Sequence, residues 1–184
     1  MSIDQTQLSK FLSLILRHKP DVIGLELDSQ GWANIEQVID KAHAAGTTFD
    51  RTELLHVVET SDKKRFSVSA DGLRIRAAQG HSVSVELGLS SKVPPPMLYH
   101  GTTRFVEAIL QQGLKPQARQ QVHLSLDKET ARRVGARHGR PHIFEVDALA
   151  MHASGFQFYL ADNGVWLTDR VPPEFLVRSS AAAE

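Results

Sequence analysis

The chain has 184 residues, enough for one large or two small domains, and 41% of them are hydrophobic, which is ordinary for a soluble globular protein. It contains no cysteine, so disulfide bonds, thiolate nucleophiles and cysteine-based zinc sites are excluded. The 21 Lys and Arg residues equal the 21 Asp and Glu residues in number, so any binding of nucleic acid must depend on local clusters of positive charge. No apolar run approaches the roughly 20 residues of a membrane span, and Met1–Lys10 is not a signal peptide, so we expect a cytoplasmic protein.

The first predicted element is an amphipathic helix over Gln5–Arg17, whose apolar residues recur at helical spacing. Arg17, His18 and Lys19 close this helix, and Pro20 stops it. Positive charges at the C-terminus of a helix are stabilised by its macrodipole, by about 0.3 to 1 kcal/mol each. From spacing alone, these three residues are therefore either a charged helix end or a functional cluster.

Two further helices are predicted, over Ile35–Ala44 and after an N-cap at Asp50, and the hydrophobic pattern then changes to the alternation of strands. Asp71-Gly72 predicts the turn of a β-hairpin. Three short helices followed by a hairpin are typical of a winged helix, a module that commonly contacts nucleic acid. Basic residues around the hairpin form either a phosphate-binding patch or a solvated face. They are Lys63, Lys64, Arg65, Arg74 and Arg76.

A stretch rich in serine and proline, Ser90–Pro96, is the best candidate for a linker. We therefore predict an N-terminal lobe over residues 1–92, a C-terminal lobe over residues 93–178 and a disordered tail over residues 179–184. The C-terminal lobe mixes helix and strand patterns, and Asn163-Gly164 is its strongest hairpin signal. Its other predicted elements are strands at Met97–His100, Val122–Leu124 and His142–Val146 and helices at Arg104–Gln112 and Lys128–Arg137. The predicted fold class is α+β, with a mixed or antiparallel sheet in the C-terminal lobe.

Common catalytic motifs are missing from the sequence. Among nine histidines, His138 and His142 are close in the chain, but Gly139 and Pro141 prevent a shared helix face, so no metal site is predicted. Phosphate-binding loops, dinucleotide-binding glycine motifs and serine nucleophile elbows do not occur. Arginine and histidine residues remain as the candidates for catalysis. Guanidinium groups bind phosphate bidentately, which suits a reaction at a phosphate held between two lobes.

A second polar cluster, Tyr99-His100-Gly101-Thr102, is predicted to end a strand in a polar loop. Gly101 has no Cβ and would let backbone donors come close to a ligand. The alternative is a turn in which His100 only forms hydrogen bonds with its neighbours.

Further motifs accompany these clusters. In chain order they are Leu8-Ser9-Lys10-Phe11-Leu12-Ser13, Leu16-Arg17-His18-Lys19-Pro20, Lys64-Arg65-Phe66, Ile75-Arg76-Ala77, Gln79-Gly80-His81-Ser82, Tyr99-His100-Gly101-Thr102, Val122-His123-Leu124-Ser125, Val134-Gly135-Ala136-Arg137-His138-Gly139 and Asn163-Gly164-Val165-Trp166-Leu167. This series, over roughly residues 8–176, closely resembles the NAD-dependent RNA 2′-phosphotransferases, which remove the splice-junction 2′-phosphate from ligated tRNA. The resemblance implies an N-terminal winged-helix RNA-binding lobe and a C-terminal NAD-binding lobe of ADP-ribosyltransferase type.

The resemblance also implies the residues of the site. The catalytic set of the family falls on Arg17, His18, Arg65 and Arg119, with Arg132 or Arg133 as alternatives to Arg119. Contacts with NAD are expected from His100, Gly101, Thr102, His123, Ser125, Gly135, Arg137 and Val165, and contacts with RNA from Lys19, Lys64, Arg76 and His81. Val165 stands where protein-modifying relatives have a glutamate, which fits a nucleophile that is already an anionic phosphate.

The implied reaction consumes NAD⁺ as a co-substrate, needs no metal and has two steps. The RNA 2′-phosphate attacks the anomeric carbon of the nicotinamide riboside and expels nicotinamide. The ribose 2″-hydroxyl of the ADP-ribosylated RNA then attacks the phosphorus, which gives 2′-hydroxyl RNA and ADP-ribose 1″,2″-cyclic phosphate. The arginines would bind the phosphate, and His18 is suited to handling a proton. The expected partner is a tRNA-like RNA with a 2′-phosphate, and the protein is expected to be a monomer.

Two alternatives remain open. One is an ADP-ribosyltransferase that modifies terminal phosphates of nucleic acids and stops after the first step. The other is a winged-helix regulator that binds nucleic acid without consuming NAD. The regulator is disfavoured because Arg17 and His18 close the first helix instead of belonging to a recognition helix.

Overall fold

The computed structural model describes residues 3–136 and 139–178 of the chain, which divides into two units, Met1–Gly88 and Leu89–Glu184. The sequence predicted a boundary slightly later, between residues 92 and 93. The predicted disordered tail over residues 179–184 lies outside the described residues. Within the described ranges, no helix is both long and apolar enough to cross a membrane.

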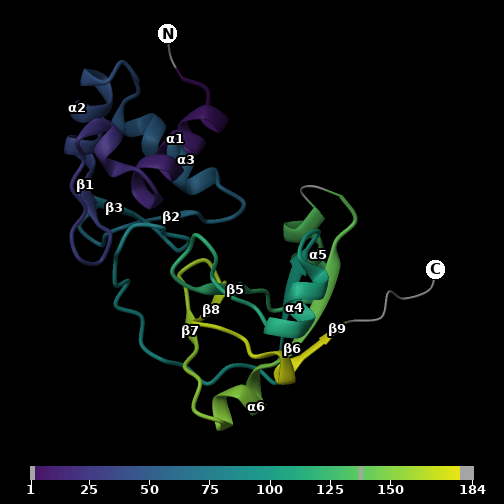
Figure 1. Ribbon diagram of the computed structural model, residues 1–184. Helices are drawn as coiled ribbons and strands as arrows, with labels where there is room; N and C mark the ends of the chain where they lie inside the picture. Colours follow the sequence, from purple (N-terminus) through teal and green to yellow (C-terminus); the bar gives the residue numbers. More distant parts are fainter. Residues whose placement is uncertain (1–2, 137–138, 179–184) are drawn as a thin grey trace. The chain divides into compact units, whose positions relative to one another are not determined.

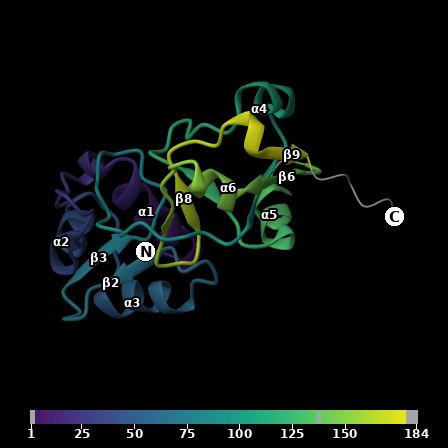
Figure 2. The same ribbon diagram turned by 90° about the horizontal axis from the view of Figure 1, so that it is seen from below.

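The described part of the N-terminal unit combines three α-helices with a small antiparallel sheet. The helices are α1 (Gln5–Arg17), α2 (Ile35–Ala44) and α3 (Arg51–Thr60), and a short 3-10 helix, η1 (Pro20–Ile23), follows α1. The strands pair in the order β1 (Ala33–Asn34), β3 (Arg74–Ala77) and β2 (Phe66–Val68), and β2 and β3 lie side by side in Figures 1 and 2. The three predicted helices and the predicted hairpin are confirmed.

Local chemistry fixes both ends of α1. The Asp4 side chain accepts a hydrogen bond from the Gln7 backbone N–H at 2.8 Å, and the Gln7 side chain accepts one from the Asp4 N–H, so the first turn is capped. Pro20 prevents the helix from continuing at the other end. One side of α1 is buried in the core of the unit through Leu8, Leu12, Ile15 and Leu16. The polar side of the helix is therefore left for the surface.

The hairpin between β2 and β3 turns at Asp71-Gly72, as predicted. Gly72 has a φ of +72°, in the left-handed region that glycine adopts without strain. One carboxylate oxygen of Asp71 accepts hydrogen bonds from the Ser69 hydroxyl at 2.5 Å and from the Leu73 N–H at 3.0 Å. Both bonds lower the pKa of Asp71 below its usual value, and the bond from Ser69 has the larger effect.

In its described residues, the C-terminal unit contains two antiparallel sheets of three strands each. The first has the order β4 (Met97–Thr102), β6 (His142–Asp147) and β9 (Leu176–Arg178), and the second β5 (Val122–Leu124), β8 (Trp166–Thr168) and β7 (Tyr159–Leu160). The helices are α4 (Val106–Gln112), α5 (Lys128–Gly135) and α6 (Ala148–Ala153), and a 3-10 helix, η3 (Pro173–Phe175), precedes β9. Helix α5 packs on β4 and β6 (Figure 1). Both units mix helices with small antiparallel sheets, which confirms the predicted α+β class.

Some elements of the C-terminal unit differ from the prediction. Helix α4 begins at Val106 and not at Arg104, because Phe105 has a left-handed backbone with a φ of 60°. Helix α6 was not predicted, since its six residues are too few to show a helical period. The hairpin at Asn163-Gly164 is confirmed, with β7 and β8 paired across it.

Gly101 of β4 and Gly135 of α5 lie against each other. A Cβ on Gly101 would lie 1.9 Å from the carbonyl oxygen of Ala131, and a Cβ on Gly135 would lie 2.7 Å from the carbonyl carbon of Gly101. The two glycines therefore allow the helix and the strand to pack at backbone contact. The sequence associated the missing side chain of Gly101 with a ligand, but the structure shows that it makes room for α5.

Candidate functional site

Arg17 and His18 end α1 and are held by the segment that follows β3. The backbone N–H groups of Ser82 and Val83 donate to the Arg17 carbonyl oxygen at 2.9 and 3.3 Å. The Nδ1 atom of His18 lies 3.0 Å from the Ser82 hydroxyl oxygen, within hydrogen-bonding distance. His18 is exposed, and its contact with Ser82 limits the orientation of its ring.

Arg65 lies beside the same helix end. The Arg17 guanidinium donates from Nη2 to the Arg65 carbonyl oxygen at 3.2 Å. The Arg65 guanidinium reaches the hydroxyls of Ser9 at 3.5 Å and Ser61 at 3.4 Å. Its neighbour Lys64 has a φ of 41°, a strained backbone for a residue with a side chain. The structure thus brings Arg65 to Arg17 and His18, although Arg65 lies 48 residues after Arg17 in the sequence.

A groove of about 540 Å³ opens on the N-terminal unit, and His18 and Arg65 are among the residues that line it. We call it the α1 groove. It is lined by the polar side of α1 and by the end of α3 with the residues after it: Gln5, Thr6, Ser9, Lys10, Ser13, Leu14, His18, Val57, Thr60, Ser61, Asp62, Lys63 and Arg65. The sequence analysis did not assign the serines of this groove to the site. Their signal was the spacing of Ser9 and Ser13, which puts them on one helix face.

The expected RNA-contacting residues occupy two kinds of position. Lys19 and Lys64 are exposed, but neither lines the α1 groove. Arg76 and His81 are buried, with 9% and 2% of their surface exposed. Direct contact of these two side chains with RNA, which we expected from the sequence, does not fit such positions.

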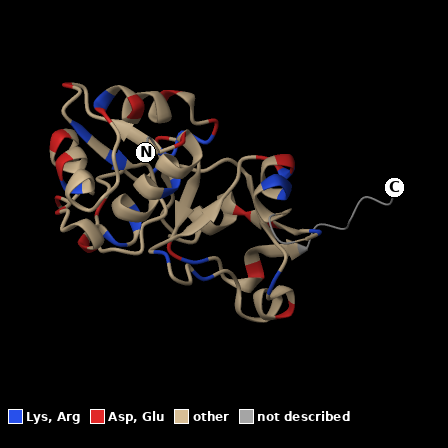
Figure 3. Cartoon of the chain, turned by 90° about the horizontal axis from the view of Figure 1, so that it is seen from above, with Lys and Arg blue, Asp and Glu red and all other residues tan. Residues whose placement is uncertain are grey.

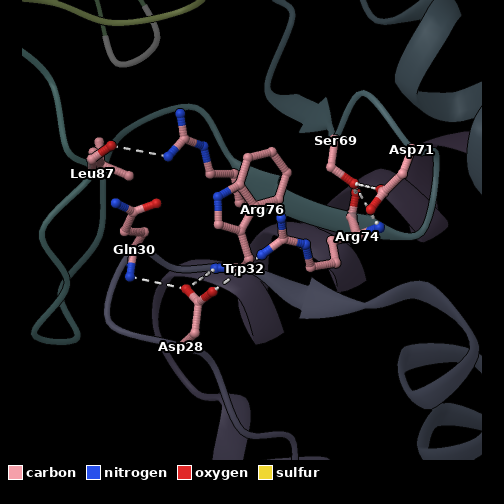
Figure 4. A network of polar contacts seen from close by, with 8 residues as sticks. All are labelled: Asp28, Gln30, Trp32, Ser69, Asp71, Arg74, Arg76 and Leu87. Atoms are coloured by element: carbon pink, nitrogen blue, oxygen red, sulfur yellow. Dashed lines mark hydrogen bonds and ion pairs between the residues drawn. The ribbon is translucent and has the colours of Figure 1, made fainter.

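Arg76 has partners inside the N-terminal unit. Its Nη1 atom donates to the Leu87 carbonyl oxygen at 3.0 Å, and its guanidinium carbon lies 4.5 Å from the centre of the Trp32 ring (Figure 4). The Trp32 backbone is held in turn by Asp28, whose side chain accepts from the Trp32 N–H at 2.9 Å. Arg76 therefore connects the β1 loop with the segment after β3, a role in the fold of the unit.

His81 lies close to the positive charges of Arg17 and Arg76. Burial of its imidazole, followed by the positive charges of Arg17 and other neighbours, lowers the pKa of His81 from 6.5 to about 4. His81 is therefore neutral at pH 7. A neutral ring can pack beside two guanidinium groups, whereas an imidazolium there would repel both.

Over the N-terminal unit, basic and acidic residues are interspersed (Figure 3). This agrees with the equal numbers of positive and negative residues in the sequence. Attraction of a polyanion therefore depends on local groups such as those of the α1 groove.

In the C-terminal unit, a bridge between Tyr99 and Ser125 connects the two sheets. Each backbone N–H donates to the other residue's carbonyl oxygen, at 2.9 and 2.7 Å. The bridge places His100 beside His123, and His100 Nδ1 lies 3.0 Å from the His123 carbonyl oxygen. The carbonyl can only accept, so Nδ1 of His100 carries the proton and Nε2 is the unprotonated nitrogen.

Arg119 fixes the protonation of His123. Its Nη1 atom lies 2.6 Å from His123 Nδ1, and because a guanidinium can only donate, this nitrogen is unprotonated. Burial, together with the charge of Arg119, lowers the pKa of His100, although its bond to His123 opposes the shift. His100 is therefore neutral at pH 7, and the contact with Arg119 requires an unprotonated Nδ1 on His123. Through its Nε2 atom His100 can accept a hydrogen bond, and through its Nε2–H His123 can donate one.

A second cavity, of about 370 Å³, lies in the C-terminal unit. We call it the His100 pocket. Four of the expected residues line it: His100, Thr102, Arg119 and His123. Gly101, Ser125, Gly135 and Val165 are not among the described residues that line it, and Arg137 lies outside the described part of the chain. Further lining residues were not predicted, and they include Phe105, Gln112, Gln117 and Gln121.

Leu124 of β5 pairs with Trp166 of β8. Ser125 follows Leu124 and Val165 precedes Trp166, so both residues lie at the same end of the β5–β8 ladder. Arg132 and Arg133, the alternatives to Arg119, are exposed on α5 and do not line the pocket. Of these three arginines, Arg119 is therefore the one that lines the pocket with the two histidines.

Strained backbone occurs in the His100 pocket as well as next to Arg65. Besides Lys64, the described non-glycine residues with positive φ are Phe105, at 60°, and Gln117, at 58°. Both line the His100 pocket. Such conformations are costly and cluster at functional sites. No three histidine or carboxylate groups in the described ranges are arranged to hold a metal ion.

Comparison with known proteins identifies the family. A profile described as RNA 2′-phosphotransferase, Tpt1 / KptA family, matches residues 4–170. A protein of Agrobacterium fabrum with the name "Probable RNA 2′-phosphotransferase" is 59% identical over 181 residues, 97% of this chain and 97% of that protein. Proteins of the same name from Pectobacterium carotovorum and Streptomyces coelicolor are 57% and 53% identical over 171 residues each, which cover 92% of this chain and 92% and 93% of those proteins. With two arginines and a histidine gathered at one helix end, and a match over nearly its whole length, the chain belongs to the Tpt1/KptA family of RNA 2′-phosphotransferases.

Proposed function

We propose that this protein removes an internal, splice-junction type 2′-phosphate from RNA by transferring it to NAD⁺. The observation that carries the proposal is the meeting of Arg17, His18 and Arg65 at the end of α1. A 2′-phosphate monoester is doubly charged near neutral pH and has several acceptor oxygens, which arginine forks match in shape and charge. Membership of the family supplies the RNA 2′-phosphate as the substrate class.

The architecture supports the same proposal. Three helices and a three-stranded antiparallel sheet with a hairpin, as found among the described residues of the N-terminal unit, are the parts of a winged-helix RNA-binding lobe. The C-terminal unit would be the NAD-binding lobe of ADP-ribosyltransferase type, with its functional histidines on the neighbouring strands β4 and β5.

The His100 pocket has a donor set that fits NAD⁺. His123 offers an N–H donor, His100 an acceptor and Thr102 a hydroxyl, which suit the carboxamide and ribose hydroxyls of a nicotinamide riboside. Arg119 supplies a positive charge that suits a phosphate. A volume of about 370 Å³ lies within the range of about 300 to 1,000 Å³ of small-molecule sites. NAD⁺ would supply an electrophilic carbon with nicotinamide as its leaving group.

In the first step, the RNA 2′-phosphate attacks that anomeric carbon, a new C–O bond forms, and nicotinamide leaves with the electron pair of the broken C–N bond. The phosphate is already an anion, so no side chain needs to remove a proton from it, and Val165 in place of a carboxylate is tolerated. Arg17 and Arg65 would orient the phosphate for attack.

In the second step, the ribose 2″-hydroxyl attacks the phosphorus and the RNA 2′-oxygen leaves, which gives ADP-ribose 1″,2″-cyclic phosphate. The hydroxyl loses a proton and the leaving oxygen gains one. His18 is placed to transfer a proton here, with its ring oriented by Ser82. Arg17 and Arg65 would stabilise the charge on the five-coordinate phosphorus.

The test uses the purified protein and an RNA with one internal, radiolabelled 2′-phosphate, with and without NAD⁺ and in the presence of EDTA. We expect the label to leave the RNA as ADP-ribose cyclic phosphate only when NAD⁺ is present. Arg119→Ala should abolish release, whereas Arg133→Ala, its matched control on α5, should retain it. Label that stays on the RNA as an ADP-ribosyl adduct would favour the alternative that stops after the first step, and label untouched by NAD⁺ would contradict the proposal.

A further inference from the structure

The α1 groove is larger than one phosphate group requires. Its volume is about 540 Å³, and only two of the residues that line it, His18 and Arg65, belong to the proposed catalytic set. The rest of the groove runs along the polar side of α1, through Ser9, Lys10 and Ser13, and along the end of α3 and the residues after it. The proposed chemistry leaves this part of the groove without a function.

The lining of this remaining part includes the apolar Leu14 and Val57, but most of its polar side chains share one chemistry. Hydroxyl and ammonium groups predominate, from Ser9, Ser13, Thr60, Lys10 and Lys63. Among the described lining residues, Asp62 is the single carboxylate. Hydroxyl, lysine and arginine side chains are the groups that commonly bind phosphate and sugar oxygens of nucleic acids. The groove is therefore suited to several acceptor oxygens in a row.

Apart from the imidazole of His18, no aromatic side chain is present among the described residues that line the groove. Bases of single-stranded nucleic acid are commonly held by stacking on aromatic rings, and such stacking is not available along the part of the groove beyond His18. Any nucleic acid in the groove would therefore be bound through its backbone, with little dependence on base identity.

We propose that the α1 groove binds the sugar-phosphate backbone of the single-stranded RNA that flanks the nucleotide with the 2′-phosphate. The proposal rests on the proposed function, because it takes Arg17, His18 and Arg65 as the groups that act on the 2′-phosphate itself. Lys10 and Lys63 contact phosphodiester groups of the flanking strand, and the serines donate to phosphate or ribose oxygens. The flanking strand lies on α1 and not on the buried Arg76 and His81.

The test compares two substrates and three variants of the full chain. The substrates are a minimal 2′-phosphorylated dinucleotide and a 12-nucleotide RNA with one central 2′-phosphate. The variants are Lys10→Ala, Lys63→Ala and, as a matched control, Lys92→Ala, which replaces an exposed lysine of the C-terminal unit. Binding is measured by fluorescence anisotropy without NAD⁺, and KM and kcat are measured with it.

We expect Lys10→Ala and Lys63→Ala each to raise Kd and KM for the 12-nucleotide RNA about 5-fold and to leave both constants for the dinucleotide within 2-fold of wild type. Each should also reduce the slope of log Kd against log salt by about 0.7, the value for one phosphate contact on a single strand. Lys92→Ala should change none of these. Changing the bases of the 12-nucleotide RNA should have little effect.

Lys10→Gln serves as a second variant, since it removes the charge but keeps most of the side-chain length. The groove proposal is overturned if both lysine variants bind the 12-nucleotide RNA like wild type, or if they weaken the dinucleotide equally. Failure of the proposed function gives a different result: wild type would bind the RNA without releasing the 2′-phosphate in the presence of NAD⁺.

Discussion

The protonation state of His81 makes a measurable prediction about stability. In the folded protein burial and nearby positive charges lower its pKa to about 4, whereas in the unfolded chain the value is 6.5. Between these two pH values the unfolded chain binds a proton that the folded protein does not bind. The free energy of unfolding must therefore fall as the pH is lowered through this window, and the stabilisation is fully present only above about pH 6.5.

The size of the effect follows from the two pKa values. A pKa of about 4 against 6.5 corresponds to about 3 kcal/mol in total, at about 1.36 kcal/mol for each pH unit between them. About 2 kcal/mol of this should be lost between pH 7 and pH 5. The His81→Gln variant has no titrating group at this position. Between pH 7 and pH 5, its free energy of unfolding should therefore fall by about 2 kcal/mol less than that of wild type.

The assay is urea unfolding of the N-terminal unit in the full chain. The two tryptophans lie in different units, so Trp166→Phe leaves Trp32 as the fluorescence probe of the N-terminal unit. The quantity of interest is the difference in free energy of unfolding between His81 and His81→Gln at each pH. His56→Gln replaces an exposed histidine of the same unit and is the control. A difference that stays constant from pH 7 to pH 5 would refute the conclusion that His81 is held neutral.

Three further predictions concern packing, orientation and capping. Gly101→Ala places a Cβ 1.9 Å from the Ala131 carbonyl oxygen and should lower the free energy of unfolding by about 3 kcal/mol, measured by Trp166 fluorescence; an unchanged melting temperature would count against backbone contact between α5 and β4. Ser82→Ala should lower kcat several-fold with little change in KM, and Ser82→Thr should restore it, since the hydroxyl orients His18 at 3.0 Å; equal loss in both variants would point to packing instead. Asp50→Ala removes the capping box of α3 and should cost about 1 kcal/mol, measured by urea unfolding; a change below about 0.3 kcal/mol would mean that the cap contributes little.

Several features of this protein were determined by short stretches of sequence. Helix α1 has its apolar period, its Asp4 cap and its stop at Pro20 within one segment, and both hairpins carry their turn residues at Asp71-Gly72 and Asn163-Gly164. The ordered motifs were also enough to predict the family, which the comparisons confirm. These features depend on interactions within a few residues, so they are visible in the sequence.

The tertiary structure alone decided which polar residues are buried and which line a groove or pocket. Arg76 and His81 stand in a basic stretch and look like contacts for RNA, but Trp32 and the Leu87 carbonyl hold Arg76 inside the unit. Gly101 looks like a ligand-binding glycine, yet its neighbour is α5.

The meetings of distant residues were likewise absent from the sequence pattern. Arg65 donates to the Ser9 hydroxyl across 56 residues, and the Tyr99–Ser125 bridge brings His100 to His123. Helical and strand periods report which side of an element is apolar, but not which other element covers it. Burial, protonation and the shape of a groove depend on contacts between segments far apart in the chain, and only the folded structure brings these segments together.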